Sequence, residues 1–273
     1  MPKTSGYHGF TTEGQVDYLF IGSSQTRQDL NPKLLEDSLG KIYLLAYNAN
    51  SFYYMDFIIN IMLKKNQAPK KIIIEAYPYR AFLKMEPSDS RLFNELDYDD
   101  KIKYLQASRT VLSNWDIYDL MMLQGNEGML TYPITKGFMN SLSYKGGYAN
   151  KTISGISAEK FLKLKPPIPD SLHYTGLDTN QVAALNRIIA LAGKNNIEIV
   201  FLEPPAAINI TNTGIFKSAQ ADLKKRITEA GKKYIGPDDY KFDTNDQTLF
   251  GDGVHLSSAG RDLYTNSVIK FIR

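Results

Sequence analysis

The stretch Val16-Asp17-Tyr18-Leu19-Phe20-Ile21-Gly22-Ser23-Ser24 joins a run of apolar residues to a glycine and two serines. A short apolar run that ends at a glycine is typical of a buried strand, and serine directly after it is typical of a helix N-terminus. Two more apolar runs follow at 41–46 and 71–76, with helical spacing over 32–39 and 52–65. Continuous apolar strands that alternate with helices predict a parallel sheet covered on both faces.

The alternation stops near residue 83 and resumes near residue 175. The segment between is rich in aromatic residues, glycine, serine and asparagine, and it is too long for a plain loop in a compact fold. We interpret it as an insertion or cap, at about 83–175, within a single domain that covers 1–273. The expected elements of this segment are helices over 99–112 and 115–123, a loop over 137–155 and a rigid proline-rich connector at 165–169.

After this segment the strand and helix signals return. They predict a helix from its Asp178 cap to about 195, a strand at 197–202, a helix over 215–233, a short strand near 234–235 and a last helix capped by Ser257 or Ser258. The predicted fold class is a three-layer α/β/α sandwich with a central parallel sheet and one large insertion.

Composition excludes several classes of function. The chain has no cysteine, which excludes disulfides, thiol catalysis and thiolate metal sites. With only His8, His173 and His255, a multi-histidine zinc site is disfavoured, and we expect neither a metal nor a cofactor. A net charge of +3 is too small to favour a nucleic-acid partner. No run approaches the ~20 apolar residues of a membrane span, and residues 1–6 hold no apolar signal-peptide core, although a leader or anchor could precede them.

The stretch Asp252-Gly253-Val254-His255-Leu256 carries the chemistry together with Ser24. Serine becomes a good nucleophile when a base removes its proton, and the base needs a group that holds its tautomer. Asp252 can reach the far ring nitrogen of His255 across the turn that Gly253 permits. Alone, Gly-Ser-Ser is more often a helix cap and Asp-x-x-His a surface turn. Both lie at strand-to-helix junctions here, which favours a Ser-His-Asp site at the carboxyl edge of the sheet.

These motifs resemble the SGNH (GDSL-like) hydrolase superfamily. That superfamily has its nucleophile after the first strand and an Asp-x-x-His before the last helix. Residues 47–51 are similar to its second block, and 72–78 occupy the third-strand position. The resemblance implies a flavodoxin-like fold and covers the α/β core but not the inserted segment. The Gly-Ser-Ser variant resembles the extracytoplasmic acyl-transfer branch, which includes polysaccharide O-acetyltransferase domains and D-alanyl transfer proteins.

By position, the resemblance implies that Ser24 is the nucleophile, His255 the base and Asp252 the orienting carboxylate. Ser23 occupies a position where many relatives have Asp. Ala49 or Asn50 occupies the position of the second-block glycine, whose N–H binds the oxyanion in relatives.

The oxyanion asparagine that usually follows the third strand is missing. Asn48 or Asn50 could supply a side-chain amide instead, beside the Ser24 N–H.

Three more residues lie near the predicted edge. Arg27 could meet an anionic substrate group, although a surface salt bridge is the commoner role. Tyr77 could contact substrate or pack against the insertion. Glu203 ends the fourth predicted strand, where it could line the cleft or be solvated.

The expected function is serine-dependent acyl transfer, with acetyl as the expected acyl group, to or from a cell-envelope or extracellular polysaccharide. The resemblance implies an acylated or acyl-accepting glycan, a membrane-bound acyl-donor partner and an extracytoplasmic location. One alternative is a simple carboxylesterase or lipase with water as acceptor. Another is a catalytically weak domain that binds glycan or assembles a complex, which the missing oxyanion asparagine favours.

Overall fold

The computed structural model describes residues 7–13, 15–65, 67–83, 92, 95–108, 152–166, 168 and 172–273. Its centre is a five-stranded sheet in the order β2-β1-β3-β4-β5, with every neighbouring pair parallel. The strands are β1 (Tyr18–Gly22), β2 (Ile42–Ala46), β3 (Lys71–Glu75), β4 (Glu198–Leu202) and β5 (Lys233–Ile235). This order is that of flavodoxin-like doubly wound folds, so the predicted parallel sheet is confirmed.

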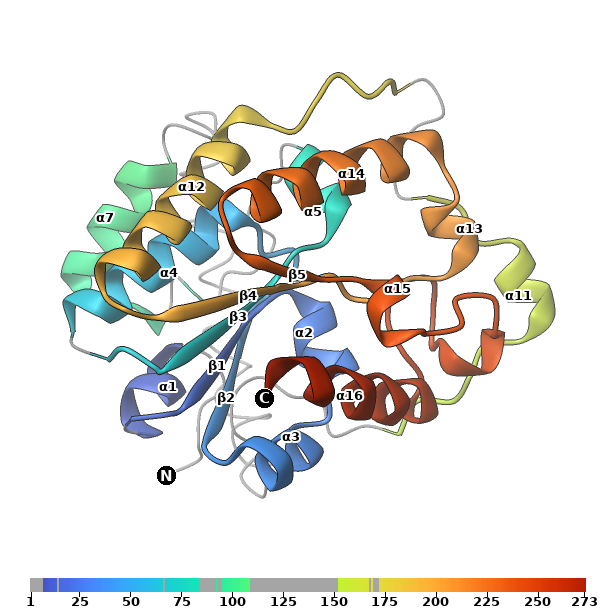
Figure 1. Cartoon of the computed structure of the whole chain (residues 1–273), viewed down its shortest axis with the longest axis horizontal. Coiled ribbons are helices and arrows are strands. Elements are labelled where there is room, and N and C mark those ends of the chain that lie inside the picture. Colours follow the sequence, from blue (N-terminus) through green and yellow to red (C-terminus); the bar gives the residue numbers. More distant parts are fainter. Residues whose placement is uncertain are drawn as a thin grey trace.

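Helices cover both faces of the sheet (Figure 1). On one face lie α2 (Ser24–Asp29), α3 (Pro32–Leu39) and α16 (Ser258–Ile272), and on the other lie α4 (Phe52–Lys64), α12 (Thr179–Lys194) and α14 (Gly214–Glu229). Alternate strand residues divide the core into two clusters, because successive side chains point to opposite faces. In β1, Leu19 and Ile21 join the α4 side, and Phe20 joins the α16 side. The predicted three-layer sandwich is confirmed.

Shorter elements complete the described chain. They are α1 (Tyr7–Glu13), α5 (Pro78–Phe82), α7 (Tyr98–Ser108), α11 (Ala158–Leu162), α13 (Ile208–Thr211), α15 (Pro237–Tyr240) and a 3-10 turn, η2 (Gln247–Leu249).

Side-chain caps begin the helices that position the site. Asp178 accepts hydrogen bonds from two backbone N–H groups at the start of α12, as its sequence predicts. At α16, the cap is Ser257, whose Oγ accepts the Gly260 N–H at 3.1 Å. Ser258 instead accepts the N–H of Ile153 at 2.9 Å, so it ties α16 to the inserted segment.

Some predicted boundaries differ from the structure. The helix expected over 215–233 is α14, which ends at Glu229, because Gly231 has a φ of 68° and Lys233 already begins β5. The helix expected over 99–112 corresponds to α7. The helix at 115–123 and most of the loop at 137–155 lie outside the described residues, and the connector at 165–169 is described only in part.

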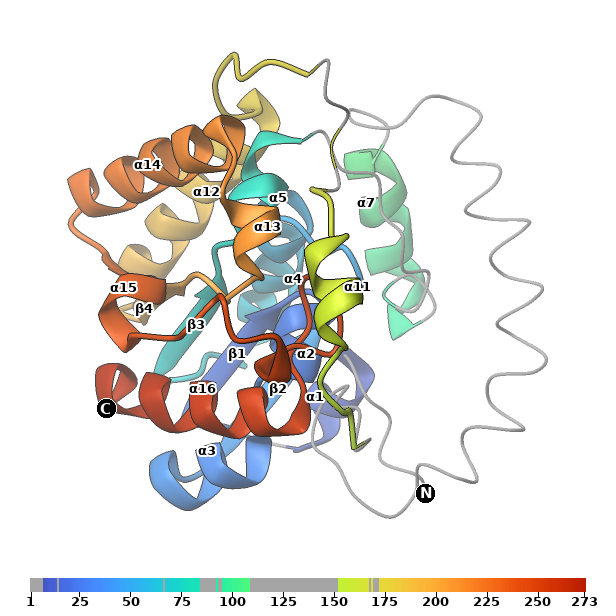
Figure 2. The same ribbon diagram turned by 90° about the vertical axis from the view of Figure 1, so that its right-hand side faces the viewer.

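Residues 152–166, which we call the return segment, run along the loop that precedes α16. Ile153 and Ser258 exchange bonds in both directions, and the Ile156 N–H donates to the carbonyl of Phe250 at 2.9 Å. A Cβ at Gly155 would lie 2.7 Å from the Thr248 carbonyl oxygen, so the two backbones are in close contact. In Figure 2 the return segment, which includes α11, lies in front of the strands. The return segment is therefore bound closely to the loop that precedes α16.

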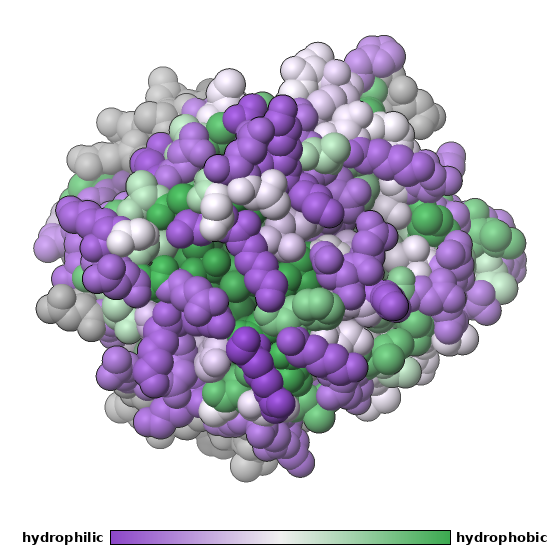
Figure 3. All heavy atoms as spheres, viewed as in Figure 1, coloured by the Kyte–Doolittle hydropathy of each residue, from purple (hydrophilic) through white to green (hydrophobic). Residues whose placement is uncertain are grey.

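Polar side chains cover most of the face seen in Figure 3, with apolar side chains grouped toward its centre. No helix within the described ranges is long and apolar enough to cross a membrane.

Candidate active site

Ser24 and His255 are brought together across 231 positions of the chain. Ser24 is the first residue of α2, directly beyond the carboxyl end of β1, and His255 lies in the loop before α16. The Oγ of Ser24 is 2.8 Å from the Nε2 of His255, which is hydrogen-bonding distance. The nucleophile-to-base contact expected from sequence is thus present in the structure.

Asp252 holds the opposite side of the imidazole. Its Oδ2 is 2.8 Å from the Nδ1 of His255. Its Oδ1 accepts the backbone N–H groups of Val254 and His255, each at 2.8 Å, so the turn itself fixes the carboxylate. An ionised carboxylate can only accept, so Nδ1 carries the proton and Nε2 is left to accept the Ser24 hydroxyl.

Both partners have shifted pKa values. Burial alone raises the pKa of the Asp252 carboxyl, but hydrogen bonds from His255 and from the backbone outweigh burial, and the pKa is lower than usual. Burial alone lowers the pKa of His255, but the Asp252 hydrogen bond and nearby negative charges outweigh it, so that pKa is raised. Asp29 and Glu75 supply the negative charge besides Asp252. The site therefore favours the imidazolium that forms when His255 accepts a proton.

The two neighbouring serines have different surroundings. Ser23 is fully buried, and its Oγ accepts the Gln25 N–H at 3.3 Å as the N-cap of α2. Ser24 is partly exposed and faces His255. The capping interpretation of Gly-Ser-Ser thus applies to Ser23 and not to Ser24.

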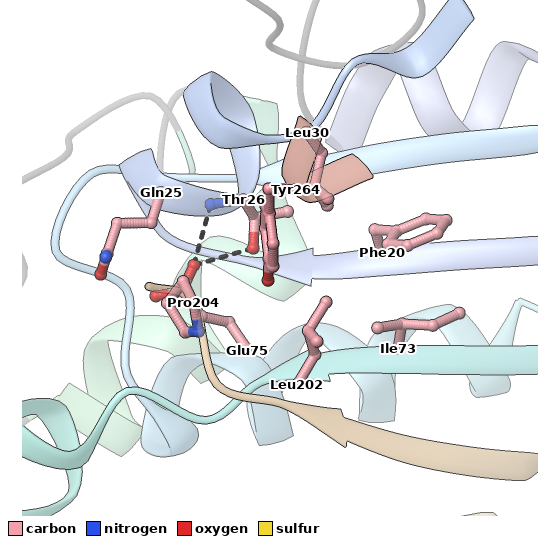
Figure 4. Close-up of a pocket in the computed structure, with 9 residues that line it drawn as sticks. All are labelled: Phe20, Gln25, Thr26, Leu30, Ile73, Glu75, Leu202, Pro204 and Tyr264. Atoms are coloured by element: carbon pink, nitrogen blue, oxygen red, sulfur yellow. Dashed lines mark hydrogen bonds between the residues drawn. The ribbon is translucent and has the colours of Figure 1, made fainter. Parts of the chain in front are cut away.

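Glu75, at the end of β3, supports the first turn of α2. One carboxylate oxygen, Oε2, accepts the N–H of Ser23 at 2.8 Å. The same oxygen accepts the N–H of Thr26 at 3.0 Å and the hydroxyl of Thr26 at 2.8 Å (Figure 4). Negative charge at a helix N-terminus is favourable. Glu75 falls within the predicted strand at 71–76, and a glutamate at the end of an apolar strand is the one signal in the sequence for this buried role.

Gly22 is required by this close approach. A Cβ on Gly22 would lie 2.0 Å from the Thr26 Oγ1 and 2.6 Å from the Glu75 Oε2. No side chain fits in that space, so glycine at the end of β1 allows Glu75 to reach beneath the nucleophile turn.

The loop after β2 borders the Ser24 turn. Asn50 is buried, its Nδ2 donates to the carbonyl of Gly22 at 3.1 Å and its Oδ1 accepts the Ser51 N–H. Its amide therefore holds the loop against β1, whereas sequence analysis also considered it as an oxyanion donor. Ala49 has a φ of 51°, in the left-handed region that favours glycine. Ala49 thus has the backbone conformation that glycine adopts most readily.

Arg27 and Asn48 meet at the rim of the site. The Nη2 of Arg27 donates to the Oδ1 of Asn48 at 2.6 Å. This hydrogen bond joins α2 to the loop after β2.

Tyr77 has only 4% of its surface exposed, and its ring packs against Tyr79 and Phe216. The ring of Tyr77 therefore lies in the hydrophobic core, which disfavours contact with substrate, and the same core cluster includes Phe161 of the segment at 83–175. The chain turns directly from β3 into α5, and α14 covers that turn, so the tyrosine enters the core.

Glu203 is not solvated at the end of β4. It is 1% exposed, and it accepts hydrogen bonds from the Gln220 amide and the Tyr234 hydroxyl. Burial raises the pKa of this carboxyl to about 7. Glu203 is thus a buried core acid beside β5.

No group of three or more histidine, aspartate or glutamate side chains in the described ranges is arranged to hold a metal ion.

No family model and no curated protein matches the sequence. Among solved structures, a GDSL-like lipase from Bacteroides thetaiotaomicron is similar, with a TM-score of 0.44 and 10% identity over 93% of this chain and 86% of that one. An acetylxylan esterase from Geobacillus stearothermophilus has a TM-score of 0.44 and 12% identity, over 100% of this chain and 96% of that one. The C-terminal catalytic domain of peptidoglycan O-acetyltransferase A from Streptococcus pneumoniae has a TM-score of 0.37 and 11% identity, over 94% and 92%.

Proposed function

We propose that the chain is a serine-dependent acyl-transfer enzyme in which Ser24 is the nucleophile, His255 the general base and Asp252 the orienting carboxylate. The observation that carries the proposal is the continuous path from Ser24 Oγ through both ring nitrogens of His255 to Asp252, with 2.8 Å at each step. Nucleophile, base and orienting group in this geometry are the requirements of acyl transfer.

The reaction proceeds in two halves. The Ser24 oxygen attacks the ester carbonyl while its proton moves to His255 Nε2, and collapse of the tetrahedral intermediate expels an alcohol that takes this proton. The second alcohol, or water, then gives its proton to Nε2 and attacks the acyl-serine, which releases the acyl product and restores the Ser24 hydroxyl.

The oxyanion is stabilised by backbone N–H groups in this proposal. The first N–H groups of a helix have no acceptor within the helix. In α2, the Gln25 N–H donates to the Ser23 side chain and the Thr26 N–H donates to Glu75. The Ser24 N–H belongs to the same residue as the reacting oxygen. The Ser24 N–H is one proposed donor, and the N–H of Ala49, in the left-handed loop, is the second.

Acetyl as the acyl group and a polysaccharide as donor or acceptor are proposed on the resemblance of the motifs. An extracytoplasmic location and a membrane-bound acyl-donor partner are proposed on the same resemblance. Water as acceptor would make the same site a carboxylesterase. The chemistry at Ser24 is identical in both cases, because only the acceptor of the acyl group differs.

The test uses p-nitrophenyl acetate as donor, with and without a xylo-oligosaccharide or a peptidoglycan fragment as acceptor. We expect release of p-nitrophenolate and an acetyl group on Ser24 in trapped enzyme, neither of which Ser24→Ala shows. Acetylated oligosaccharide identifies a transferase, and acetate alone identifies an esterase. Release of p-nitrophenolate that is equally fast in Ser24→Ala, or no reaction with any activated ester, contradicts the proposal. The alternative of a domain that binds glycan or assembles a complex would then remain.

A further inference from the structure

Helix α2 holds the catalytic loop at two points, one on each side of His255. The Gln25 side-chain Nε2 donates to the carbonyl of Val254 at 3.0 Å. The Asp29 Oδ1 accepts the N–H of Leu256 at 2.8 Å. His255 therefore lies between two residues whose backbones are bonded to the same helix.

Both side chains are buried, and the Asp29–Leu256 contact is buried as well, whereas the Gln25–Val254 contact is partly buried. Gln25 is 2% exposed and Asp29 is fully buried. The two residues are four positions apart, which puts them on the same face of α2. Hydrogen bonds in such surroundings are electrostatically stronger than in water, and a backbone group that loses its partner there is costly.

The same helix begins at Ser24. A displacement of the loop by about 1 Å would lengthen the Ser24–His255 contact, and misplacement of that size can cost on the order of 100-fold in rate. We propose that Gln25 and Asp29 are positioning residues that clamp the His255 loop to the nucleophile helix, so that base and nucleophile move as one unit. The inference rests on the proposed function for the catalytic roles of Ser24 and His255.

Burial of the Asp29 carboxyl destabilises the fold, and a role in positioning the His255 loop explains why an aspartate is present there. Its Oδ2 is buried with no hydrogen-bond partner within the described residues. Burial raises the pKa of this carboxyl well above its usual value, and the positive charge of His255 opposes that shift. An incompletely bonded buried carboxyl destabilises a fold. Its location beside the base is consistent with a role in the site.

Three variants test the clamp. Asp29→Leu removes the acceptor, Gln25→Leu removes the donor, and Asp29→Asn keeps an Oδ1 that can accept the Leu256 N–H. Asp56→Asn is the matched control, because Asp56 is a buried carboxylate paired with Arg187 at 2.7 Å on the opposite face of the sheet. Circular dichroism verifies that each variant is folded.

The kinetic readout is kcat and KM for p-nitrophenyl acetate, per site titrated with a fluorophosphonate. We expect kcat to fall at least ~10-fold in Asp29→Leu and Gln25→Leu with KM within about twofold, because neither residue touches substrate. Asp29→Asn restores most of kcat. Equal kcat per titrated site in wild type, Gln25→Leu and Asp29→Leu, or a loss that Asp56→Asn reproduces, overturns the clamp.

A second readout does not depend on activity. The chain has three histidines, so the imidazole signals of His255 can be assigned in NMR spectra by their absence in His255→Ala. The clamp predicts a protected Nδ1–H signal in wild type and Asp29→Asn that exchanges with water in both leucine variants. An unchanged signal in the leucine variants rejects the clamp. A failed esterase assay together with the predicted NMR pattern rejects the proposed function and retains the clamp.

Discussion

Ser23 and Ser24 are neighbours in the chain with opposite environments. Ser23 is a buried cap and Ser24 faces the imidazole. The sequence Gly-Ser-Ser predicts a strand-to-helix junction with two candidate hydroxyls. Which hydroxyl reaches the base depends on the rotation of the helix about its axis, which is set by Glu75 binding from another strand.

The two serines therefore give a matched pair of variants. Ser24→Ala is expected to abolish turnover of p-nitrophenyl acetate. Ser23→Ala is expected to retain turnover and to lower the free energy of unfolding by about 1 kcal/mol, the usual cost of a lost N-cap. Urea unfolding and steady-state rates measure both. Loss of turnover in folded Ser23→Ala, with retention in Ser24→Ala, would exchange their roles.

In the proposed mechanism, His255 sets the pH dependence of the reaction. Only its neutral form can accept the Ser24 proton, and its pKa is raised by Asp252, Asp29 and Glu75 against the effect of burial. We expect kcat/KM to rise with pH through a midpoint above the ordinary histidine value of about 6.5. Asp252→Asn should lower that midpoint and reduce kcat by roughly 10²- to 10⁴-fold. A flat profile from about pH 5 to 9 would contradict general-base catalysis by His255.

At the scale of elements, the strands were predictable because each contains a short run of apolar residues. The predicted strand at 71–76 is β3, Lys71–Glu75, and the strand at 197–202 is β4, Glu198–Leu202. Helix ends were less predictable where a local backbone feature decides them, as Gly231 does after α14.

The contacts of α2 were not predictable from sequence. Asp29 meets a backbone group 227 positions away, and no local pattern encodes that pairing. The contacts of His255 with Asp252 and Ser24 could be predicted, because Asp252 and His255 are close in sequence and Ser24 follows a recognisable strand.

Helix α2 depends on Glu75 for its first turn. Glu75→Ala leaves three buried donors without an acceptor and should cost roughly 2–4 kcal/mol of unfolding free energy. Glu75→Gln keeps one acceptor oxygen and should cost less. Glu75→Gln also removes a negative charge near His255, so the pH midpoint of kcat/KM should fall. Equal stability of wild type and Glu75→Ala would show that α2 has another anchor.

At the scale of the whole molecule, the site lies where the direction of strand order reverses. β1 is flanked by β2 and β3, and ligands of open α/β sheets bind at the carboxyl ends of strands at such a point. Ser24, Asn48 and Glu75 all lie at or just beyond these strand ends. The return segment is hydrogen-bonded to the start of α16, just after the His255 loop, through Ile153 and Ser258.

Glu203 links the stability of the whole fold to pH. Its folded pKa of about 7 lies above the ordinary glutamate value of 4.5, so the folded state binds this proton more tightly than the unfolded state. The resulting stability is present below about pH 4.5 and is lost as pH rises through about 7, with a total of about 3 kcal/mol. Glu203→Gln should flatten the pH dependence of urea unfolding in this window. An identical slope in both proteins would contradict a buried, proton-binding Glu203.

The most direct test of the account is covalent labelling of the nucleophile. Wild type, Ser24→Ala and His255→Ala are exposed to a fluorophosphonate, and peptide mass spectrometry locates the adduct. The account predicts one adduct, on Ser24, that forms rapidly in wild type and is lost or strongly slowed in His255→Ala. An adduct that forms at the same rate without His255, or no adduct on Ser24 in folded wild type, would contradict a Ser24–His255–Asp252 acyl-transfer site.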